Sequence, residues 1–227
     1  MKYHIIKFFN LCGCLEECSK SVKEKENQPD ATNFTVCKSV LNSKSKDESL
    51  ANFAKWEPWH GKFGFSYPWE KYLKIGEILR ELASLILALE RCLLASKNVL
   101  IYFTFKYLKI FLPTATLKRS KAQLEQCEAI GSRVVWTLRE VGDSLKKMRK
   151  CEERENIIAK LKTTREELSL VISTSNISEF ENGEMLAIAS LVFLLMEVVD
   201  KVGELVIEAG ELQDKAGFRT RVTPVSS

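Results

Sequence analysis

The sequence predicts an all-α fold, a bundle of long amphipathic helices with coiled-coil-like packing. Apolar residues recur at helical spacing over long stretches of the 227 residues, and no stretch alternates with the period of two expected of a half-buried strand. Helix breakers are few, since the chain holds five prolines and ten glycines. Because amphipathic helices cannot bury their apolar stripes alone, we expect them to pack on each other.

The chain divides into three predicted parts. Residues 1–30 are expected to form a helix followed by a polar linker. Residues 31–215 are expected to form the helical domain, within which residues 97–123 form a distinct aromatic and basic segment. Residues 216–227 are expected to be a disordered tail.

The first helix of the domain is predicted from Ser45 to Trp56. Ser45 and Glu48 fit a capping box, in which the serine oxygen accepts a backbone N–H and the glutamate reaches back to the helix start. We expect the apolar face of this helix to consist of three residues: Leu50, Phe53 and Ala54.

The second helix is predicted to start near Pro68, a residue suited to a first helical turn. A seam of apolar residues follows with alternating steps of three and four, which is a strict heptad pattern. Its members are Tyr72, Ile75, Leu79, Leu82, Ile86, Leu89 and Leu93.

Three further helices are predicted over residues 116–150, 152–173 and 183–215. The first has a heptad seam of Leu124, Cys127, Gly131, Val134, Leu138, Val141, Leu145 and Met148. The second has a looser stripe of Ile158, Leu161, Arg165, Leu168 and Ile172. The third has a seam of Ile188, Leu191, Leu195, Val198, Val202, Leu205, Ala209 and Leu212. Residues 179–214 hold nine acids and one base, and residues 116–150 nine bases and four acids, so charge is expected to favour particular helix neighbours.

No segment reaches the roughly 20 consecutive apolar residues that a membrane-spanning helix needs. The longest uncharged run, Met185–Met196, has twelve residues and is expected to be a buried helix. The second candidate, Asn98–Leu112, contains Lys106 and Lys109. Lysines near a helix end can extend toward the membrane surface, so for this segment insertion into lipid stays open as the alternative.

The sequence predicts no enzyme, no cofactor, no metal site and no nucleic-acid partner. The two histidines, His4 and His60, are far apart, and no phosphate-binding loop pattern occurs. Cys12, Cys14 and Cys18 lack a fourth metal ligand nearby, and an odd total of seven cysteines indicates reduced thiols. A formal charge of +4 is too small to indicate nucleic-acid binding, and no such signature is present.

The acid-free stretch 97–124 carries six bases, and aromatic residues alternate with the first three. These bases are Lys97, Lys106, Lys109, Lys118, Arg119 and Lys121. Bases beside aromatic residues suit contact with an anionic membrane surface. A core helix with solvated lysines explains the pattern equally well, so both interpretations stay open.

The stretch from Lys38 to Gly76 contains several short motifs: Trp56-Glu57-Pro58, His60-Gly61, an aromatic strip from Phe63 to Tyr67, Pro68-Trp69 and Tyr72-Leu73-Lys74-Ile75-Gly76. In these residues the chain resembles the segment that opens the cytosolic half of plant aluminium-activated malate transporters, a family of anion channels. The resemblance extends from Cys14 to about Ala95. The remaining helices resemble the family in pattern more than in identity.

The resemblance implies a truncated family member connected with malate or other anion transport at the plasma or vacuolar membrane, with this chain facing the cytoplasm. The piece from Cys14 to Glu17 resembles the family's exit from its last membrane helix, and residues 1–10 do not match that helix. We therefore expect the chain to begin where the pore ends and not to conduct alone. The expected partners are a second copy of the chain or full-length family subunits.

Two interpretations of Trp56-Glu57-Pro58 are open. In the first, the proline ends a helix and the tryptophan packs on the bundle. In the second, which the resemblance favours, Glu57 pairs with a basic group and ties the cytosolic domain to the pore, as a gating element. For the whole chain, the alternative function is a soluble helical-bundle module for protein interaction without transport. A third hypothesis is a fragmentary gene model, which the upstream exons of the transcript would test.

Overall fold

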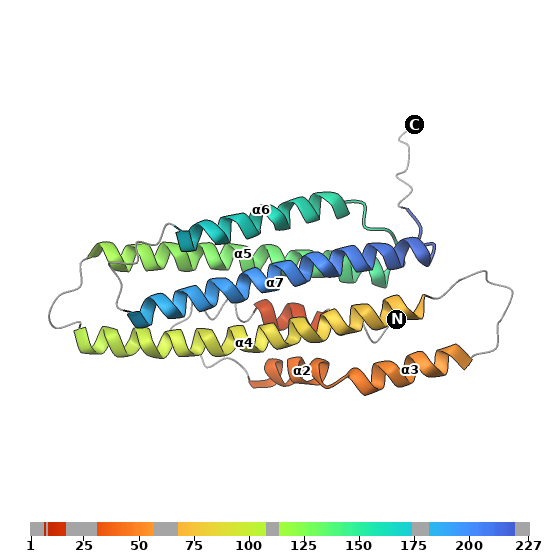
Figure 1. Cartoon of the computed structure of the whole chain (residues 1–227), viewed down its shortest axis with the longest axis horizontal. Helices are drawn as coiled ribbons and strands as arrows, with labels where there is room; N and C mark the ends of the chain where they lie inside the picture. The colour runs from red at the N-terminus through yellow and green to blue at the C-terminus, as the bar shows by residue number, and fades with distance from the viewer. Residues whose placement is uncertain are drawn as a thin grey trace.

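The computed structural model shows long helices that run side by side along one axis (Figure 1). It describes residues 7, 9–16, 31–56, 68–107, 114–173 and 182–220. Residues 9–16 form a short helical segment, and the named helices are α2 (Ala31–Leu41), α3 (Lys44–Trp56), α4 (Trp69–Tyr107), α5 (Thr114–Lys146), α6 (Arg154–Ser173) and α7 (Asn182–Lys215). Within these ranges the backbone forms one isolated bridge and no strand. The all-α prediction is confirmed.

Helix α7 packs against three other helices, α4, α5 and α6. Lys71, near the start of α4, pairs with Glu208 and Glu211 near the end of α7, so these two helices are antiparallel. Helices α2 and α3 lie end to end along the side of α4 (Figure 1). The separate segment predicted over 98–112 is, as far as Tyr107, the continuation of α4.

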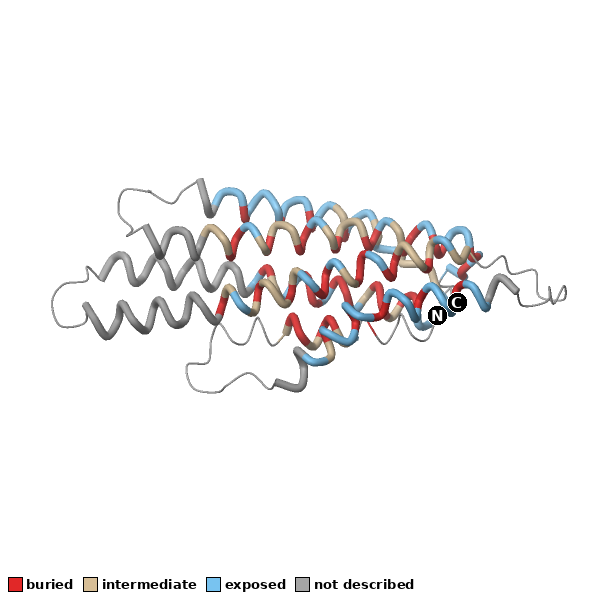
Figure 2. Tube along the Cα trace, turned by 60° about the horizontal axis from the view of Figure 1, so that its bottom comes forward, coloured by how far each residue is buried: buried red, intermediate tan, exposed pale blue. Residues whose placement is uncertain are grey.

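The predicted heptad seams of α4 and α7 form the centre of the core. All seven seam residues of α4 are buried, and so are the seam residues of α7 from Leu191 to Leu212. Helix α5 contributes Val134, Leu138, Val141 and Leu145, as predicted. Figure 2 shows the buried positions recurring along the facing sides of these helices. Coiled-coil-like interlocking of the seams stays a prediction.

The predicted stripe of α6 is wrong at Arg165, which is exposed and pairs with Asp200 of α7. Leu161 and Leu168 are buried as predicted, and Ile158 is half-buried against the core. The stripe also includes Ile157 and Thr164, which are buried and were not predicted. Thr164 can occupy a buried position because its hydroxyl donates to the carbonyl of Lys160 at 2.8 Å, which leaves its methyl group free to pack.

Helix α5 ends at Lys146, four residues before its predicted end. Met148 has a φ of 50°, and two backbone bonds close the terminus: Met148 N–H to the Leu145 carbonyl (3.2 Å) and Arg149 N–H to the Ser144 carbonyl (3.0 Å). This is a Schellman cap, which reverses the chain direction at the end of a helix. Met148, predicted to lie in the seam, is therefore exposed.

Helix α7 ends with the same type of cap. Gly217 has a φ of 65°, and the Phe218 N–H donates to the Gln213 carbonyl at 2.9 Å. The cap turns Phe218 back into the core, where it is buried. Residues 216–220 are thus part of the folded domain, and the disordered tail predicted for 216–227 does not include them.

A polar contact joins the two capped ends. The buried side chain of Gln213 accepts a bond from the Cys151 N–H at 3.0 Å and donates one to the Ser144 hydroxyl at 2.8 Å. The Lys150 N–H donates to the Arg219 carbonyl at 2.9 Å. The turn between α5 and α6 is therefore held against the end of α7.

Helix α3 buries a different face from the predicted one. Leu50 and Phe53 are exposed, whereas Asp47 and Ala51 are buried. The helix begins at Lys44, one residue before Ser45. The N-cap is therefore Ser43 and not Ser45 of the predicted capping box. Asp47 N–H donates to the Ser43 carbonyl at 3.0 Å, the first bond of the helix.

Candidate functional site

The motif predicted for gating stands at the edge of the described structure. Helix α3 ends at Trp56, as predicted, and Glu57 and Pro58 lie outside the described residues. The packing and pairing of these three side chains stay predictions.

The predicted membrane-surface residues fall on two helices. Lys97 and Lys106 lie in the second half of α4, and Lys118, Arg119 and Lys121 lie in the first turns of α5. Their side chains, and Lys109 entirely, lie outside the described residues. Contact between this region and lipid stays a prediction.

A buried cluster of charges lies on the helix that leads to the motif. The Lys7 amine is 2.7 Å from both carboxylate oxygens of Asp47, and the Arg80 Nη1 is 2.6 Å from Asp47 Oδ2. The Lys7 and Asp47 side chains are 3% and 1% exposed. The Asp47 carboxylate therefore joins residue 7, α3 and α4 at one buried point.

Burial determines the electrostatics of this cluster. It lowers the pKa of Lys7, because desolvation of the ammonium outweighs the hydrogen bond and the attraction from Asp47. A charge in such a place is tolerated only while it is paired. Sequence reasoning missed Asp47 as a structural residue. The signal for it is the spacing of Ser43, Asp47 and Ala51, which lie four positions apart and form a buried stripe of two small residues with one acid between them.

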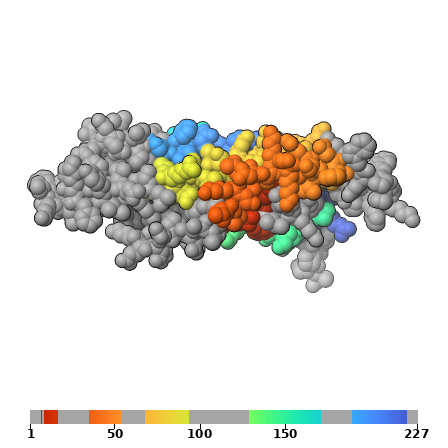
Figure 3. Space-filling model, turned by 90° about the horizontal axis from the view of Figure 1, so that it is seen from below, coloured from red at the N-terminus to blue at the C-terminus, as the bar shows by residue number. Residues whose placement is uncertain are grey.

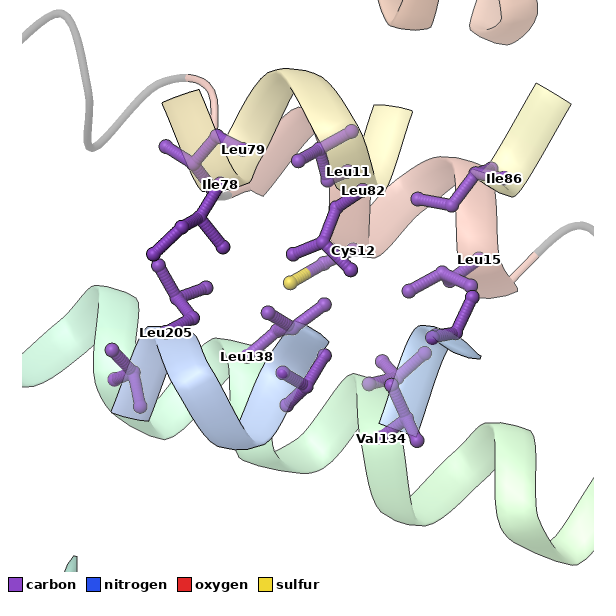
Figure 4. Close-up of a cluster of buried hydrophobic side chains, with 14 of the residues drawn as sticks. Leu11, Cys12, Leu15, Ile78, Leu79, Leu82, Ile86, Val134, Leu138 and Leu205 are labelled. Atoms are coloured by element: carbon purple, nitrogen blue, oxygen red, sulfur yellow. The ribbon is translucent and has the colours of Figure 1, made fainter. Parts of the chain in front are cut away.

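Residues 9–16 are built into the core of the bundle. Leu11, Cys12 and Leu15 are buried, and Figure 4 shows them among Leu82 and Ile86 of α4, Val134 and Leu138 of α5, and Leu205 of α7. The segment thus fills the space where these three helices face each other. Without it, apolar side chains on all three would face a cavity.

Polar contacts fix both ends of this segment. At its start, Lys7 pairs with Asp47, and the Lys146 amine lies 5.4 Å from the centre of the Phe9 ring. At its end, Glu16 pairs with Arg139 of α5. The segment therefore links α3 and α4 on one side to α5 on the other.

The cysteines of the segment are core residues. Cys12 and Cys14 are both buried, and burial raises the pKa of the Cys12 thiol to about 12, so it stays protonated at neutral pH. Cys18, the third cysteine of that group, lies outside the described residues. In the part of the chain that the structure describes, no three side chains of His, Cys, Asp or Glu gather where a metal ion could bind.

Ion pairs line the contact between α4 and α7. Lys71 binds Glu208 (2.7 Å) and Glu211 (2.6 Å), and Lys201 binds Glu81 (2.6 Å) and Glu204 (2.9 Å). These hydrogen bonds raise the pKa of both lysines and lower the pKa of Glu204 and Glu211. We refer to these pairs as the α4–α7 clasp.

The acids of α7 were expected to favour bases within 116–150 as neighbours. In the described ranges, that expectation holds for Lys150 with Asp214. Asp214 also pairs with Arg154 of α6, and other acids of α7 pair with Lys71 and Lys74 of α4 and with Arg165 of α6. The charge on α7 thus meets bases from α4, from α6 and from the turn between α5 and α6.

None of the helices, in the ranges that the structure covers, has a stretch both long and apolar enough to cross a bilayer.

Comparison with known proteins identifies the family. A family model described as aluminium activated malate transporter matches residues 4–178, which includes the N-terminal segment and helices α2 to α6. Aluminum-activated malate transporter 7 of Arabidopsis thaliana is 32% identical over 198 residues, which are 87% of this chain and 36% of that relative. Aluminum-activated malate transporter 2 of the same plant is 29% identical over 203 residues, 89% of this chain and 37% of the relative.

A third relative matches over a shorter stretch. Aluminum-activated malate transporter 1 of Triticum aestivum is 56% identical over 52 residues, 23% of this chain and 11% of the relative. The chain spans about a third of the length of the two Arabidopsis relatives (36% and 37%). Because the family model matches well over half of its residues, this chain belongs to the aluminium-activated malate transporter family.

Proposed function

We propose that this chain is a cytosolic helical module of an aluminium-activated malate transporter assembly at a membrane. It acts on malate or other anion transport through full-length family subunits and does not conduct on its own. The observation that carries the proposal is the burial of Leu11, Cys12, Cys14 and Leu15, with Cys14 and Leu15 only 1% and 3% exposed. The piece from Cys14 to Glu17 is where the chain resembles the family's exit from its last membrane helix.

A bundle built around this segment moves together with it. Close-packed cores resist independent motion of their parts, so a displacement of residues 9–16 is transmitted to the helices around them. Leu11 and Leu15 transmit it to α4, α5 and α7 through apolar contact (Figure 4). In the proposed assembly, this is how the helical module senses or restrains the membrane part of its partners.

The buried charge cluster provides a second connection. Lys7 holds Asp47 of α3, and α3 ends at Trp56, the first residue of the predicted gating motif. Arg80 holds the same carboxylate from α4. In this proposal, the N-terminal segment, the motif helix and the main bundle therefore respond as one unit.

Co-expression in plant cells tests the proposal. An epitope-tagged version of this chain, expressed with a full-length family member, is expected to co-purify with it from the solubilised membrane fraction. The chain is also expected to change the malate current of the full-length protein. Recovery of the chain only in the soluble fraction, without the full-length partner, would refute the proposal and favour the alternative of an interaction module without transport.

A second experiment tests the statement that the chain does not conduct alone. Purified chain reconstituted with liposomes is expected to give no malate uptake above that of protein-free vesicles. Uptake in the absence of other subunits would contradict a role through full-length subunits.

A further inference from the structure

Helix α3 carries an apolar stripe on its exposed side. It buries Asp47 and Ala51 and leaves Leu50 and Phe53 49% and 74% exposed. These two residues are three positions apart and hence neighbours on the helix surface. Lys46, also exposed, lies four positions before Leu50 and extends the same row. We refer to Lys46, Leu50 and Phe53 as the α3 stripe.

The buried charge cluster fixes this orientation of α3. A rotation of the helix that buried Leu50 and Phe53 would carry Asp47 away from Lys7 and Arg80, to which it is bonded at 2.7 and 2.6 Å. The two cations would then lose the carboxylate that compensates their burial. The apolar stripe is therefore held at the surface by the interior of the protein.

On α2 and α3, the exposed charge is mainly positive. Lys38, Lys44 and Lys46 are exposed on α2 and α3, and Glu48 is the one exposed acid among residues 35–53. Figure 3 views the molecule from the side on which α2 and α3 lie, with both helices in the foreground. Basic residues beside exposed phenylalanine and leucine are the composition of helices that lie on a membrane surface.

We propose that the α3 stripe docks on an anionic lipid surface. Phe53 and Leu50 enter the boundary between headgroups and acyl chains, and Lys46, in the same row of the helix, lies at the level of the lipid phosphates. This contact is made by the chain itself, so it goes beyond the proposed assembly and does not require a full-length subunit. A lipid surface accepts isolated apolar side chains without a matching shape and supplies the negative charge that the lysines favour.

A second copy of the chain fits these observations less well. In a two-fold interface the same patch faces itself, so a second copy supplies no negative charge to pair with Lys46 of the stripe. The stripe offers two large apolar side chains per copy, whereas stable interfaces bury on the order of 1,000 Å² or more. Charge and size therefore both favour lipid over self-association.

Vesicle binding by the purified full chain tests the proposal. The chain is expected to sediment with vesicles of phosphatidylcholine mixed with phosphatidylserine, and only weakly with phosphatidylcholine alone. The double variant Leu50→Ser/Phe53→Ser is expected to lower the partition coefficient about tenfold, since it removes the apolar insertion. The variant Lys46→Gln is expected to lower it several-fold and to weaken its dependence on salt.

Matched controls lie on other helices. Leu170 of α6 and Phe193 of α7 are 61% and 59% exposed, and Leu170→Ser/Phe193→Ser is expected to bind vesicles like the unmodified chain. All these substitutions are at exposed positions. Circular dichroism is the check that each variant keeps its helical content.

Four results would overturn the proposal. One is the absence of binding to the anionic vesicles, and another is unchanged binding of Leu50→Ser/Phe53→Ser. A third is that Leu50→Ser/Phe53→Ser still binds, whereas substitution of Lys97 and Lys106 abolishes binding. The contact then belongs to the aromatic and basic segment predicted over residues 97–123. The fourth is a dimer in sedimentation velocity that Phe53→Ser abolishes, which assigns the stripe to a second copy. Loss of co-purification with a full-length subunit, by contrast, bears on the proposed function alone.

Discussion

Asp47 is the residue on which the N-terminal part of the structure depends. Its carboxylate accepts bonds from Lys7 and Arg80, which are 40 and 33 positions away in the sequence. Isolated buried ions are strongly disfavoured, but a charged carboxylate between two bases satisfies all three groups. One side chain thus sets the orientation of α3 and the position of residue 7.

We predict that Asp47→Asn lowers the free energy of unfolding by about 3–5 kcal/mol, the usual effect of removing one partner from a buried ion pair. The amide keeps the shape of the side chain and removes its charge, so the loss reports on the unpaired cations. Urea unfolding followed by circular dichroism measures it. Glu48→Gln, on the exposed side of the same helix, is the matched control and is expected to stay within about 0.5 kcal/mol.

Gly203 and Gly210 form a natural pair of probes on α7. A Cβ built on Gly203 meets nothing within 4 Å, whereas on Gly210 it would lie 2.6 Å from Cδ of Arg154. Gly203→Ala is therefore predicted to stabilise the protein by about 0.5–1 kcal/mol, since alanine loses less backbone entropy in a helix.

At Gly210 the same entropic stabilisation is offset, because the Arg154 side chain must move away from Asp214, with which it pairs at 3.5 Å. Gly210→Ala is expected to be less stable than Gly203→Ala by at least roughly 0.5 kcal/mol. Thermal unfolding of both variants checks the difference. Equal stabilisation at the two sites would mean that Arg154 does not occupy the space over Gly210.

Among the elements, the N-terminal segment contributes to the apolar core although it is short. Residues 9–16 supply apolar side chains to a space bounded by α4, α5 and α7 (Figure 4). A helix this short is unstable alone, so its structure depends on the surrounding bundle. In return, it closes the core of the bundle.

We predict that Leu11→Ala destabilises the protein by about 2–5 kcal/mol, because Leu11 is fully buried and its removal leaves a cavity. Leu50→Ala, an identical change at an exposed position, is the control and is expected to change stability by less than about 0.5 kcal/mol. Urea unfolding measures both. Equal small effects would show that the segment is not part of the core in solution.

Elements with a continuous apolar seam could be predicted from the sequence. The steps of three and four from Tyr72 to Leu93 place every seam residue on one side of α4, and burial follows from that pattern alone. Which side of α6 is buried could not be predicted in this way. Thr164 packs like an apolar residue only because its hydroxyl bonds to a backbone carbonyl within the helix. A long arginine at 165 adds to the ambiguity, since its stem is apolar while its charge needs Asp200.

Prediction failed for α3 because its orientation depends on distant residues. Leu50 and Phe53 form the better apolar face by composition, yet Asp47 is buried because of bases on two other parts of the chain. Sequence periodicity carries no information on such long-range pairing. For the motif beginning at Trp56, the residues alone indicate a helix end and a packing tryptophan, and the gating role came only from resemblance to a family.

On the scale of the whole molecule, ion pairs between neighbouring helices lie along the length of the bundle, beside its apolar core. The clasp between α4 and α7 continues through Lys74 and Glu204, and Asp214 at the end of α7 is held by Lys150 and Arg154. Each exposed pair contributes little, on the order of 0–1 kcal/mol. Their effect lies in setting which helices are neighbours, while the apolar seams supply most of the stability.

The clasp and the ion pairs of Asp214 together predict that stability falls in acid. Hydrogen bonds from Lys201, Lys71 and Lys150 lower the pKa values of Glu204, Glu211 and Asp214 below their ordinary values of 4.5, 4.5 and 3.8. When a carboxyl pKa is lower in the folded than in the unfolded state, its stabilisation is complete above the ordinary pKa and is lost as the pH falls through the lowered one. Burial raises the pKa of Glu90, which acts in the opposite direction, but Glu204, Glu211 and Asp214 outnumber it.

We therefore predict a decreasing free energy of unfolding from about pH 5 down to pH 3, measured by urea titration at each pH. The double variant Glu204→Gln/Glu211→Gln has no such charges to lose, so its stability should fall less steeply over the same range. Glu166→Gln, at an exposed position on α6, should keep the slope of the unmodified chain. If the double variant and the unmodified chain gave parallel curves, the acid sensitivity would belong to other carboxylates, and the clasp would not contribute to the stability of the α4–α7 contact.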